Sequence, residues 1–382
     1  MVTFSVDGRR YYSSSTTGRD VNVGILGARG YVGMELLRLL GDHPSTNVVL
    51  ASSRALKGVS VREALNDSQA VGGGGGDRSP FADVIFCDTT ADDISNGKID
   101  KKVDVWFLAL PNGHAKEAVA AIDKVNPGAV VIDLSADYRF DCHPSATTPG
   151  DHTASKDSWI YGFAERNRPL LKGAKRISNP GCYATTVQAA LLPFSDSARG
   201  AFKTGKKDAP VIQGPVSAFC VSGYSGAGTT PSPKTDPKFL NNNLIPYSLV
   251  NHIHEREISK QMGENVRFFP HVGQWFRGIT ATISVDLDKK TSPEELFAHA
   301  QDFYRGEKLL KVLPPGEVPL VKDHVGKHGV RVGGFFVCPH TQSRAVLVST
   351  SDNLLKGAAT QAIQNLNLAL GYNELTGLPK EE

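Results

Sequence analysis

The 382-residue sequence lacks the patterns that mark several large classes of protein. No CxxC pair occurs among its five cysteines, so neither a disulfide framework nor a cysteine zinc site is indicated. The HExxH signature and other standard metal-ligand spacings are also absent, and we expect no metal. No apolar run approaches the roughly 20 residues that cross a bilayer, which argues against a membrane protein.

An excess of charge of one sign is missing as well. The 42 Lys and Arg residues outnumber the 39 Asp and Glu residues by only three, too few to predict binding to nucleic acid. Hydrophobic residues make up 40% and charged residues 21% of the chain, as in ordinary globular proteins. A chain of this length is too long for one core, so we expect two domains.

Residues 1–20 form a tail of different composition. They contain three arginines and four serines but only two acids, and they have no periodic apolar pattern. This composition is typical of a mitochondrial presequence or its remnant, although a terminus without function would fit equally well. We therefore expect the mitochondrial matrix, with the cytoplasm as the alternative.

Strand-like and helix-like segments alternate through the first part of the chain. Residues 21–26 alternate like a strand, and residues 34–40 place three leucines on one face of a helix. Further strands are expected at 47–51, 84–86, 103–110 and 129–134, with helices between several of them. This order predicts a doubly wound parallel sheet. The run of five glycines at 72–76 predicts a surface loop.

A glycine cluster joins the first strand to the first helix. Its GxxGxxG spacing is a variant of the dinucleotide-binding fingerprint. Glycine permits the tight turn and lets the backbone approach a pyrophosphate at the helix N-terminus. A structural turn would use the same residues, but the strand–turn–helix context favours a cofactor site made by Gly27, Arg29, Gly30, Tyr31, Val32 and Gly33.

The end of the second strand bears on the choice of cofactor. NAD sites usually place an acid there, whereas this sequence has Ser53 and Arg54, which suit a 2′-phosphate. Arg29 could add a second positive charge. NADP is therefore favoured over NAD, with a solvated surface arginine as the alternative interpretation of Arg54.

One cysteine has the setting of a nucleophile. Cys182 follows a Pro-Gly bend and precedes a helix expected over residues 183–192, which Pro193 ends. At a helix N-terminus the macrodipole stabilises a thiolate, and free amides offer an oxyanion site. The other four cysteines are interpreted as small apolar residues.

A histidine-rich segment could supply the base. His252 and His254 are two residues apart and would point to one side of an extended segment, with Glu255 or Glu257 orienting an imidazole. A zinc site would need a third ligand at a standard spacing, which is missing. A solvated polar loop is the remaining alternative.

At this point the sequence resembles the N-acetyl-γ-glutamyl-phosphate reductases of arginine biosynthesis. The resemblance extends from about residue 21 to residue 378 and is carried by seven ordered motifs. These are GARGYVG (27–33), VIDLSADYRF (131–140), SNPGCYATT (178–186), SGYSGAG (222–228), IPYSLVNHIHEREI (245–258), FFPHVGQWFRG (268–278) and DNLLKGAATQAIQNLN (352–367).

The resemblance implies roles for these residues. Cys182 would attack an acyl phosphate to form a thioester that NADPH reduces, with His252 as acid/base and with His254 and Glu257 in support. Arg139 and Arg277 are candidates for binding the substrate's anionic groups, and each could equally be a structural ion-pair residue. Ser225, Gly226 and Asn353 would lie near the nicotinamide.

The resemblance also implies an architecture. We expect a Rossmann domain over residues 21–180 and an inserted α+β domain with a mostly antiparallel sheet over 181–350. The last helix, within 351–382, would return to the first domain. Strands are expected at 280–287 and 345–350. Such enzymes associate through the second sheet, so a homodimer or homotetramer is expected.

Two other functions stay open. Aspartate-semialdehyde dehydrogenase uses the same cysteine chemistry on a shorter acid, but the HIHEREI and SADYR segments favour the glutamyl enzyme. A non-catalytic NADP-binding subunit would not need both Cys182 and the histidine pair. Association of an active reductase with N-acetylglutamate kinase is also possible. Arg256 and the YGFAERNR segment (161–168) depart from the family pattern, and the second leaves local substrate contacts open.

Overall fold

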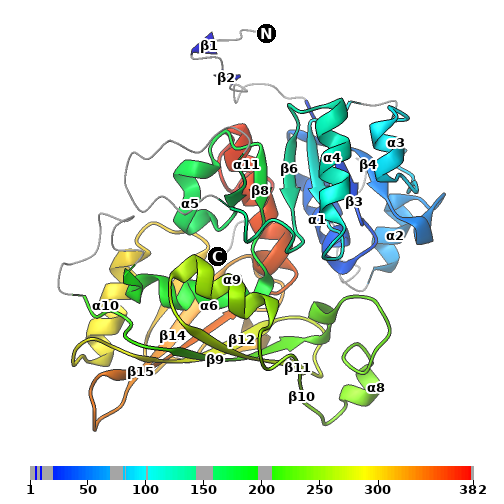
Figure 1. Ribbon diagram of the computed structural model, residues 1–382. Helices are drawn as coiled ribbons and strands as arrows, with labels where there is room; N and C mark the ends of the chain where they lie inside the picture. The colour runs from blue at the N-terminus through cyan, green and yellow to red at the C-terminus, as the bar shows by residue number, and fades with distance from the viewer. Residues whose placement is uncertain are drawn as a thin grey trace.

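The computed structural model describes residues 5–6, 9–10, 20–68, 81, 83–99, 102–142, 158–196 and 209–379. Two sheets form its framework (Figure 1), preceded by the short hairpin of β1 (Ser5–Val6) and β2 (Arg9–Arg10). Most of the tail expected to be a presequence, and the glycine run at 72–76, lie outside the described residues.

The first sheet has six parallel strands in the order β4-β3-β5-β6-β8-β7. This confirms the doubly wound α/β fold. Its strands are β3 (Val21–Leu26), β4 (Thr46–Ser52), β5 (Val105–Leu108), β6 (Val130–Asp133), β7 (Ile160–Tyr161) and β8 (Arg176–Ser178). Its helices are α1 (Tyr31–Asp42), α2 (Val61–Asp67), α3 (Ala91–Ser95), α4 (Ala115–Val125) and α5 (Ala164–Leu171).

The prediction of a strand at residues 84–86 is wrong. Ile85 makes only an isolated bridge to Ser60, and its side chain is 59% exposed. The Phe86 amide donates to the Val59 carbonyl in the turn before α2 and not to a neighbouring strand. The segment therefore follows an irregular path in which the buried Phe86 ring fills the core.

The second sheet is mixed and has seven strands in the order β10-β11-β9-β12-β15-β14-β13. Four of its six strand pairs are antiparallel, and the two strands expected from the sequence are confirmed as β12 and β15. The strands are β9 (Val216–Gly223), β10 (Ile245–Pro246), β11 (Val266–Gly273), β12 (Ile279–Asp286), β13 (Leu310–Pro315), β14 (Val330–Val337) and β15 (Arg344–Ser351).

Three helices cover the face of the second sheet that is turned toward the first domain (Figure 1). They are α6 (Cys182–Leu191), α9 (Ile253–Met262) and α10 (Pro293–Phe303). A fourth helix, α8 (Pro237–Leu240), lies in the loop between β9 and β10. The strands alternate apolar and polar residues because one face is buried under these helices while Phe219 and Thr282 face outward.

The chain then returns to the first domain. After β15 it forms a π-helical turn, η6 (Leu355–Ala359), and continues as α11 (Thr360–Leu370). Helix α11 lies against α1, α5 and β6, and its apolar residues Ile363 and Leu366 belong to the core of the first domain. Residues from the two ends of the chain thus share one core.

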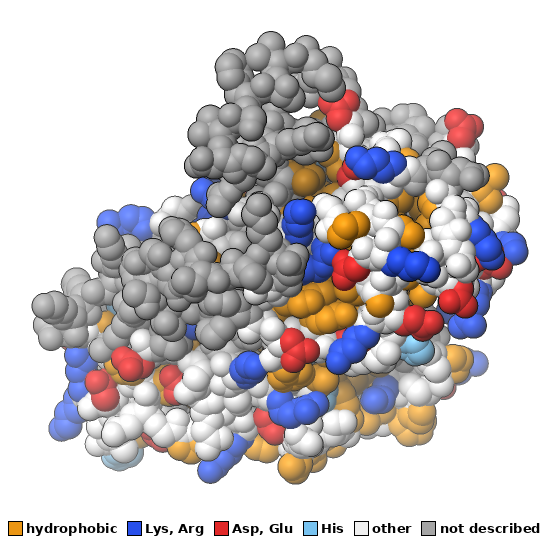
Figure 2. Space-filling model, turned by 45° about the horizontal axis from the view of Figure 1, so that its top comes forward, with side chains coloured by type: hydrophobic (Ala, Val, Ile, Leu, Met, Phe, Trp, Pro, Cys, Tyr) orange, Lys and Arg blue, Asp and Glu red, His pale blue; other side chains and the backbone are white. Residues whose placement is uncertain are grey.

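The surface of the molecule is mixed in charge. On the face drawn in Figure 2, basic and acidic side chains are interspersed among apolar and neutral ones, consistent with the net charge of +3. None of the helices in the described part of the chain is long and apolar enough to cross a bilayer.

Candidate active site

Cys182 is the first residue of α6. It follows β8 after the short link Asn179-Pro180-Gly181, so it lies where the chain passes from the carboxyl end of the first sheet to the helices over the second sheet. Gly181 is the N-cap, and no side chain caps the helix. The expected position of Cys182 at a helix N-terminus is therefore confirmed.

The link before Cys182 is held from several sides. The Asn179 carbonyl accepts a hydrogen bond from Arg139 Nε (3.0 Å), and its side chain bonds to the Ala358 carbonyl (3.2 Å) and to Asn365 (2.9 Å). A Cβ atom at Gly357 would lie 2.8 Å from Cys182 Cβ, so the π-helical turn supports the cysteine directly. Extra turns of this kind are frequent at functional sites.

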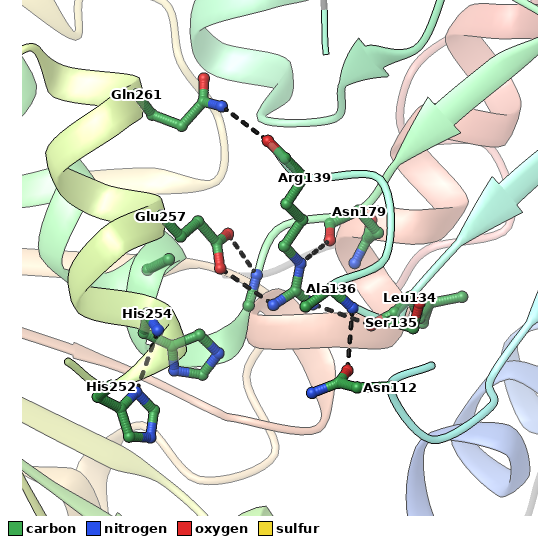
Figure 3. Close-up of polar contacts among 12 residues, drawn as sticks. Asn112, Leu134, Ser135, Ala136, Arg139, Asn179, His252, His254, Glu257 and Gln261 are labelled. Atoms are coloured by element: carbon green, nitrogen blue, oxygen red, sulfur yellow. Dashed lines mark hydrogen bonds and ion pairs between the residues drawn. The ribbon is translucent and has the colours of Figure 1, made fainter. Parts of the chain in front are cut away.

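Glu257 joins the two domains beneath this link (Figure 3). Its side chain, from α9, is fully buried and accepts from Arg139 Nη1 at 3.0 Å. Its other oxygen accepts from Tyr161 Oη (2.7 Å) and from the Gly181 amide (2.9 Å). The position of Gly181, and through it that of Cys182, therefore depends on a carboxylate from the second domain.

The sequence analysis predicted an extended histidine segment, but this prediction is wrong, because the segment begins a helix. His252 is the N-cap of α9, and its Nδ1 accepts a hydrogen bond from the His254 amide (3.0 Å). Glu255 accepts from the Asn251 amide (2.9 Å) and from the Phe268 amide (3.0 Å). The His252 side chain thus caps the first turn of α9, and Glu255 fixes that turn to the residue before the cap and to β11, which favours a helix over an extended segment. Neither Glu255 nor Glu257 hydrogen-bonds an imidazole among the described contacts.

The two imidazoles have different surroundings. A Cβ atom at Gly181 would lie 2.1 Å from His254 Nε2, so this ring rests on the residue before Cys182. Its buried Nδ1 has no hydrogen-bond partner in the described part of the chain. The His252 ring lies farther out, with centroids 5.5 Å from the Tyr247 ring and 5.1 Å from the Phe268 ring.

Burial dominates the electrostatics of these groups. It raises the pKa of the Cys182 thiol to about 11, although the Tyr183 amide and the Arg139 charge act in the opposite direction. The expected stabilisation of a thiolate by the helix terminus is thus outweighed. Burial also lowers the pKa of His252 to about 4 and that of His254 well below its ordinary value. Near neutral pH the thiol is therefore protonated and both imidazoles are neutral.

Arg139 and Arg277 both make ion pairs with buried acids. Arg139 is 5% exposed, and besides Glu257 it donates to two carbonyl oxygens. Arg277 pairs with Glu35 of α1 (2.7 Å) and with Asp352 (2.7 Å). Of the two roles left open for these arginines, their contacts favour the structural one.

The glycine turn fits a dinucleotide. Gly27 has φ of +78°, and a Cβ there would lie 2.2 Å from the Ala109 carbonyl, so only glycine is tolerated. A Cβ at Gly33 would lie 2.6 Å from the Ala28 carbonyl. Helix α1 begins at Tyr31 with Gly30 as N-cap, no side-chain cap and no acid in its first turn. Its N-terminus is therefore suited to a pyrophosphate.

The residues predicted to select NADP lie at the end of β4. Ser53 Oγ accepts from the Leu56 amide (3.3 Å) and caps the short helix η1 (Arg54–Leu56). Arg54 is exposed, as is Arg29 in the glycine turn, and the described contacts include no ion pair for either. Both guanidinium groups are therefore available to an anion.

Asn353 organises the predicted nicotinamide loop. It donates to Ser225 Oγ (2.9 Å) and accepts from the Gly278 amide (2.7 Å), which ties together β9, β12 and the end of β15. Gly226 is close-packed, since a Cβ there would lie 2.6 Å from Ser222 Oγ. The three residues predicted from the sequence are thus neighbours.

Sequence reasoning missed four residues that the structure brings to the site: Tyr161, Asn179, Tyr247 and Gly357. Asn179 lies inside the SNPGC motif and carried a signal through its position next to the bend. The other three also lie within quoted segments (161–168, 245–258 and 352–367), but nothing in those patterns assigned them a role, because what they contact is distant in sequence. Among the described residues no group of three or more His, Cys, Asp and Glu side chains is placed to hold a metal ion.

The chain matches two family models. The model described as "Semialdehyde dehydrogenase, NAD binding domain" covers residues 22–174, and "Semialdehyde dehydrogenase, dimerisation domain" covers residues 182–353. An N-acetyl-gamma-glutamyl-phosphate reductase from Xanthomonas campestris is 43% identical over 95% of this chain and 99% of its own length.

Fungal relatives are longer. Protein ARG5,6, mitochondrial, from Candida albicans is 45% identical over 94% of this chain but only 37% of its own length. Protein arg11, mitochondrial, from Schizosaccharomyces pombe is 43% identical over 98% of this chain, and the match covers 38% of the length of that relative. The chain thus spans little more than a third of these two relatives.

Solved structures share the fold. Aspartate semialdehyde dehydrogenase II from Vibrio cholerae has a TM-score of 0.63 at 20% identity, covering 92% of this chain and 98% of that one. Aspartate semialdehyde dehydrogenase with NADP from Candida albicans has a TM-score of 0.63 at 17% identity, with the same coverage. Identity this low establishes the architecture alone.

The thiol pKa values predict which cysteine reacts first. Amides of Thr341 and His340 lower the pKa of the partly exposed Cys338 thiol to about 7. At pH 8 we expect iodoacetamide to modify Cys338 before Cys182. Between pH 8 and pH 10 the rate at Cys182 should rise about tenfold per unit, because its thiolate fraction grows toward a pKa of about 11, while the rate at Cys338 stays nearly flat.

Peptide mass spectrometry after timed alkylation measures both rates in one sample. A rate at Cys182 that levels off near pH 7 in the free protein would contradict the dominance of burial.

Proposed function

Because the chain belongs to the N-acetyl-γ-glutamyl-phosphate reductases, within the semialdehyde dehydrogenase family, we propose that it reduces N-acetyl-γ-glutamyl phosphate. The products are N-acetylglutamate 5-semialdehyde and phosphate, and NADPH is the reductant, in a step of arginine biosynthesis. The observation that carries this proposal is Cys182 at the start of α6, between the two domains, with His254 resting on the residue before it.

In this proposal the half-buried thiol is activated by a neighbour. The neutral His254 ring accepts the Cys182 proton, and the thiolate attacks the acyl carbon. Amides in the first turn of α6 stabilise the oxyanion, because they have no acceptor within the helix. The bond from the acyl carbon to the phosphate oxygen then breaks, and phosphate leaves with the bonding electrons. A thioester on Cys182 remains.

NADPH, when bound, supplies the hydride that reduces the thioester. The chain's own residues return the proton of the thiol, while the proton that turns the departing phosphate into hydrogen phosphate comes from water. The thiohemiacetal on Cys182 collapses to the aldehyde, and the departing thiolate takes back the proton held on His254. The same proton thus leaves and returns to the sulfur.

The sequence left open which histidine carries the proton, with His252 as the first candidate. The contact between His254 and Gly181 favours His254 for this role. His252 would then orient the start of α9 through its bond to the His254 amide. Glu257, Arg139 and Arg277 act in this proposal as positioning residues that hold the two domains in register.

The decisive test is phosphate-dependent oxidation of N-acetylglutamate semialdehyde with NADP. We expect activity in the wild type and its loss by at least about 10³-fold in Cys182→Ala, since covalent catalysis requires the sulfur. Cys338→Ala, which removes the exposed reactive thiol, should stay active and is the matched control.

A fully active Cys182→Ala variant would exclude the thioester. Faster turnover of aspartate semialdehyde than of N-acetylglutamate semialdehyde would favour the other acyl-phosphate reductase. Absence of both activities in the folded wild type would favour a non-catalytic subunit.

NADP is the proposed cofactor, held at the glycine turn and at Ser53 and Arg54. Arg54→Ala should lower the preference for NADP over NAD in kcat/KM by about 10- to 100-fold, the value of one charge-assisted contact to the 2′-phosphate. Arg62→Ala removes an exposed arginine from α2 and should leave the ratio unchanged. Steady-state kinetics with both cofactors measure the effect, and an unaltered ratio in Arg54→Ala would remove Arg54 from the site.

A homodimer or homotetramer is the proposed assembly, joined through the outer face of the second sheet. Phe219 is 54% exposed there and stacks on Phe269, with ring centroids 4.6 Å apart. Phe219→Glu should shift the protein toward the monomer in sedimentation velocity, because it places a charge at an apolar contact. Val318→Glu, at another exposed apolar residue, is the control. An oligomer that survives Phe219→Glu unchanged would speak against this face.

Two further proposals concern the compartment and a partner protein. Three fungal relatives carry the word mitochondrial in their names, which supports the mitochondrial matrix over the cytoplasm for this chain. Imaging of the protein with and without residues 1–20 checks this.

Association with N-acetylglutamate kinase would shorten the path of a labile acyl phosphate, and co-sedimentation of the two purified proteins checks it.

A further inference from the structure

The proposed substrate carries two anionic groups, a phosphate and an α-carboxylate, but the arginines first considered for them are occupied. Arg139 is buried against Glu257, and Arg277 lies between Glu35 and Asp352. A substrate anion could recruit either guanidinium only by displacing a buried carboxylate, which would cost several kcal/mol. The site therefore needs a cation that has no acid already paired with it.

Lys234 meets this requirement. It lies in the loop between η4 (Tyr224–Ala227) and α8, and its Nζ is 4.6 Å from the centroid of the Tyr247 ring. Its side chain is half-buried, and no acidic partner occurs among the described residues. A cation on an aromatic face keeps its outward N–H donors free, so an anion can bind from the other side.

The loop around Lys234 is fixed by its own hydrogen bonds. Thr235 Oγ1 accepts from the Ser232 amide (2.8 Å) and donates to the Thr230 carbonyl (2.9 Å). These bonds span Lys234 and hold its backbone in a turn. The ammonium group is consequently presented by an ordered segment.

Tyr247 connects Lys234 to the reacting cysteine. Its ring and Cys182 both pack against the same apolar cluster, and the ring meets that of His252 edge-on at 5.5 Å. Burial and the neighbouring Cys182 both raise the pKa of Tyr247. Burial chiefly, and the Lys234 charge in addition, lower the pKa of His252. Lys234, Tyr247, His252 and Cys182 therefore border one region.

The backbone between Tyr247 and His252 is strained in a way that suits a site. Ser248 has φ of +44° and Asn251 has φ of +59°, a left-handed conformation that non-glycine residues rarely adopt. Two such residues within a four-residue span cost free energy that the fold must recover elsewhere. Across this turn the centroids of the Tyr247 and His252 rings lie 5.5 Å apart.

We propose that Lys234 is the substrate-binding cation of this site, taking an oxyanion group of the acyl phosphate, either the phosphate or the α-carboxylate. This assignment rests on the proposed function. It gives the loop after β9 the task of orienting the substrate's anionic group relative to Cys182.

The first experiment reads the local charge without requiring catalysis. In a Cys338→Ser background, Cys182 is alkylated by anionic iodoacetate and by neutral iodoacetamide, and the ratio of the two rates is taken. Lys234→Gln should lower this ratio by about two- to fivefold, because one positive charge near the sulfur is lost. Lys234→Arg should keep the wild-type ratio, and so should Lys238→Gln, an exposed lysine on α8.

The second experiment separates the two anions. In the oxidative direction, Lys234→Gln should raise the KM for inorganic phosphate or that for the semialdehyde by at least about tenfold, the value of one charged hydrogen bond. Its kcat should change far less, and Lys234→Arg should recover most of the loss. A higher KM for phosphate identifies the phosphate, and a higher KM for the semialdehyde identifies the carboxylate.

An unchanged alkylation ratio together with two unchanged KM values would overturn the assignment. Absence of activity in the wild type would exclude the proposed function. The alkylation ratio would still be measurable, and it would decide whether Lys234 acts on anions near Cys182. A loss that Lys234→Arg fails to restore in either experiment would also count against it, since it would indicate a structural and not an electrostatic role.

Discussion

The buried ion pair between Arg139 and Glu257 is the contact on which the candidate site depends. It joins the loop after β6 in the first domain to α9 in the second, and both side chains are almost completely removed from solvent. A charge buried this deeply must be neutralised and fully hydrogen-bonded, and Glu257 meets that condition through Arg139, Tyr161 and the Gly181 amide. The same bonds set the backbone from which Cys182 begins α6.

This arrangement has a chemical consequence. Cys182, His252 and His254 are all partly buried, and this loss of solvent favours the neutral forms of the thiol and of both imidazoles. A resting thiol of raised pKa is protected from oxidation and needs a proton acceptor before it can attack. The domain junction brings that acceptor, because the helix that carries Glu257 also carries His254, one turn earlier on the same face.

Local patterns in the sequence predicted most of the elements but not their surroundings. Strand β3, the glycine turn, the start of α6 at Cys182 and strands β12 and β15 were all indicated by periodicity and by glycine or proline signals. The prediction of a strand at 84–86 was wrong because a short apolar run is found in irregular core segments as well as in strands. The prediction of an extended segment at His252 was wrong because the start of α9 is stabilised by the side chains of His252 and Glu255, residue types that also occur in loops.

The sequence by itself determined the chemistry that is available: one cysteine after a Pro-Gly bend, a glycine turn for a dinucleotide, an arginine in place of an acid at Arg54, and a histidine pair. Only the tertiary structure decided how these groups are used. Arg139 and Arg277 are ion-paired across the domain junction, His254 and not His252 rests on Gly181, and Lys234 is left with an aromatic ring as its partner. The reason is that pairing and burial depend on residues from other segments of the chain, such as Arg139 and Glu257, which are 118 positions apart and which no local pattern relates.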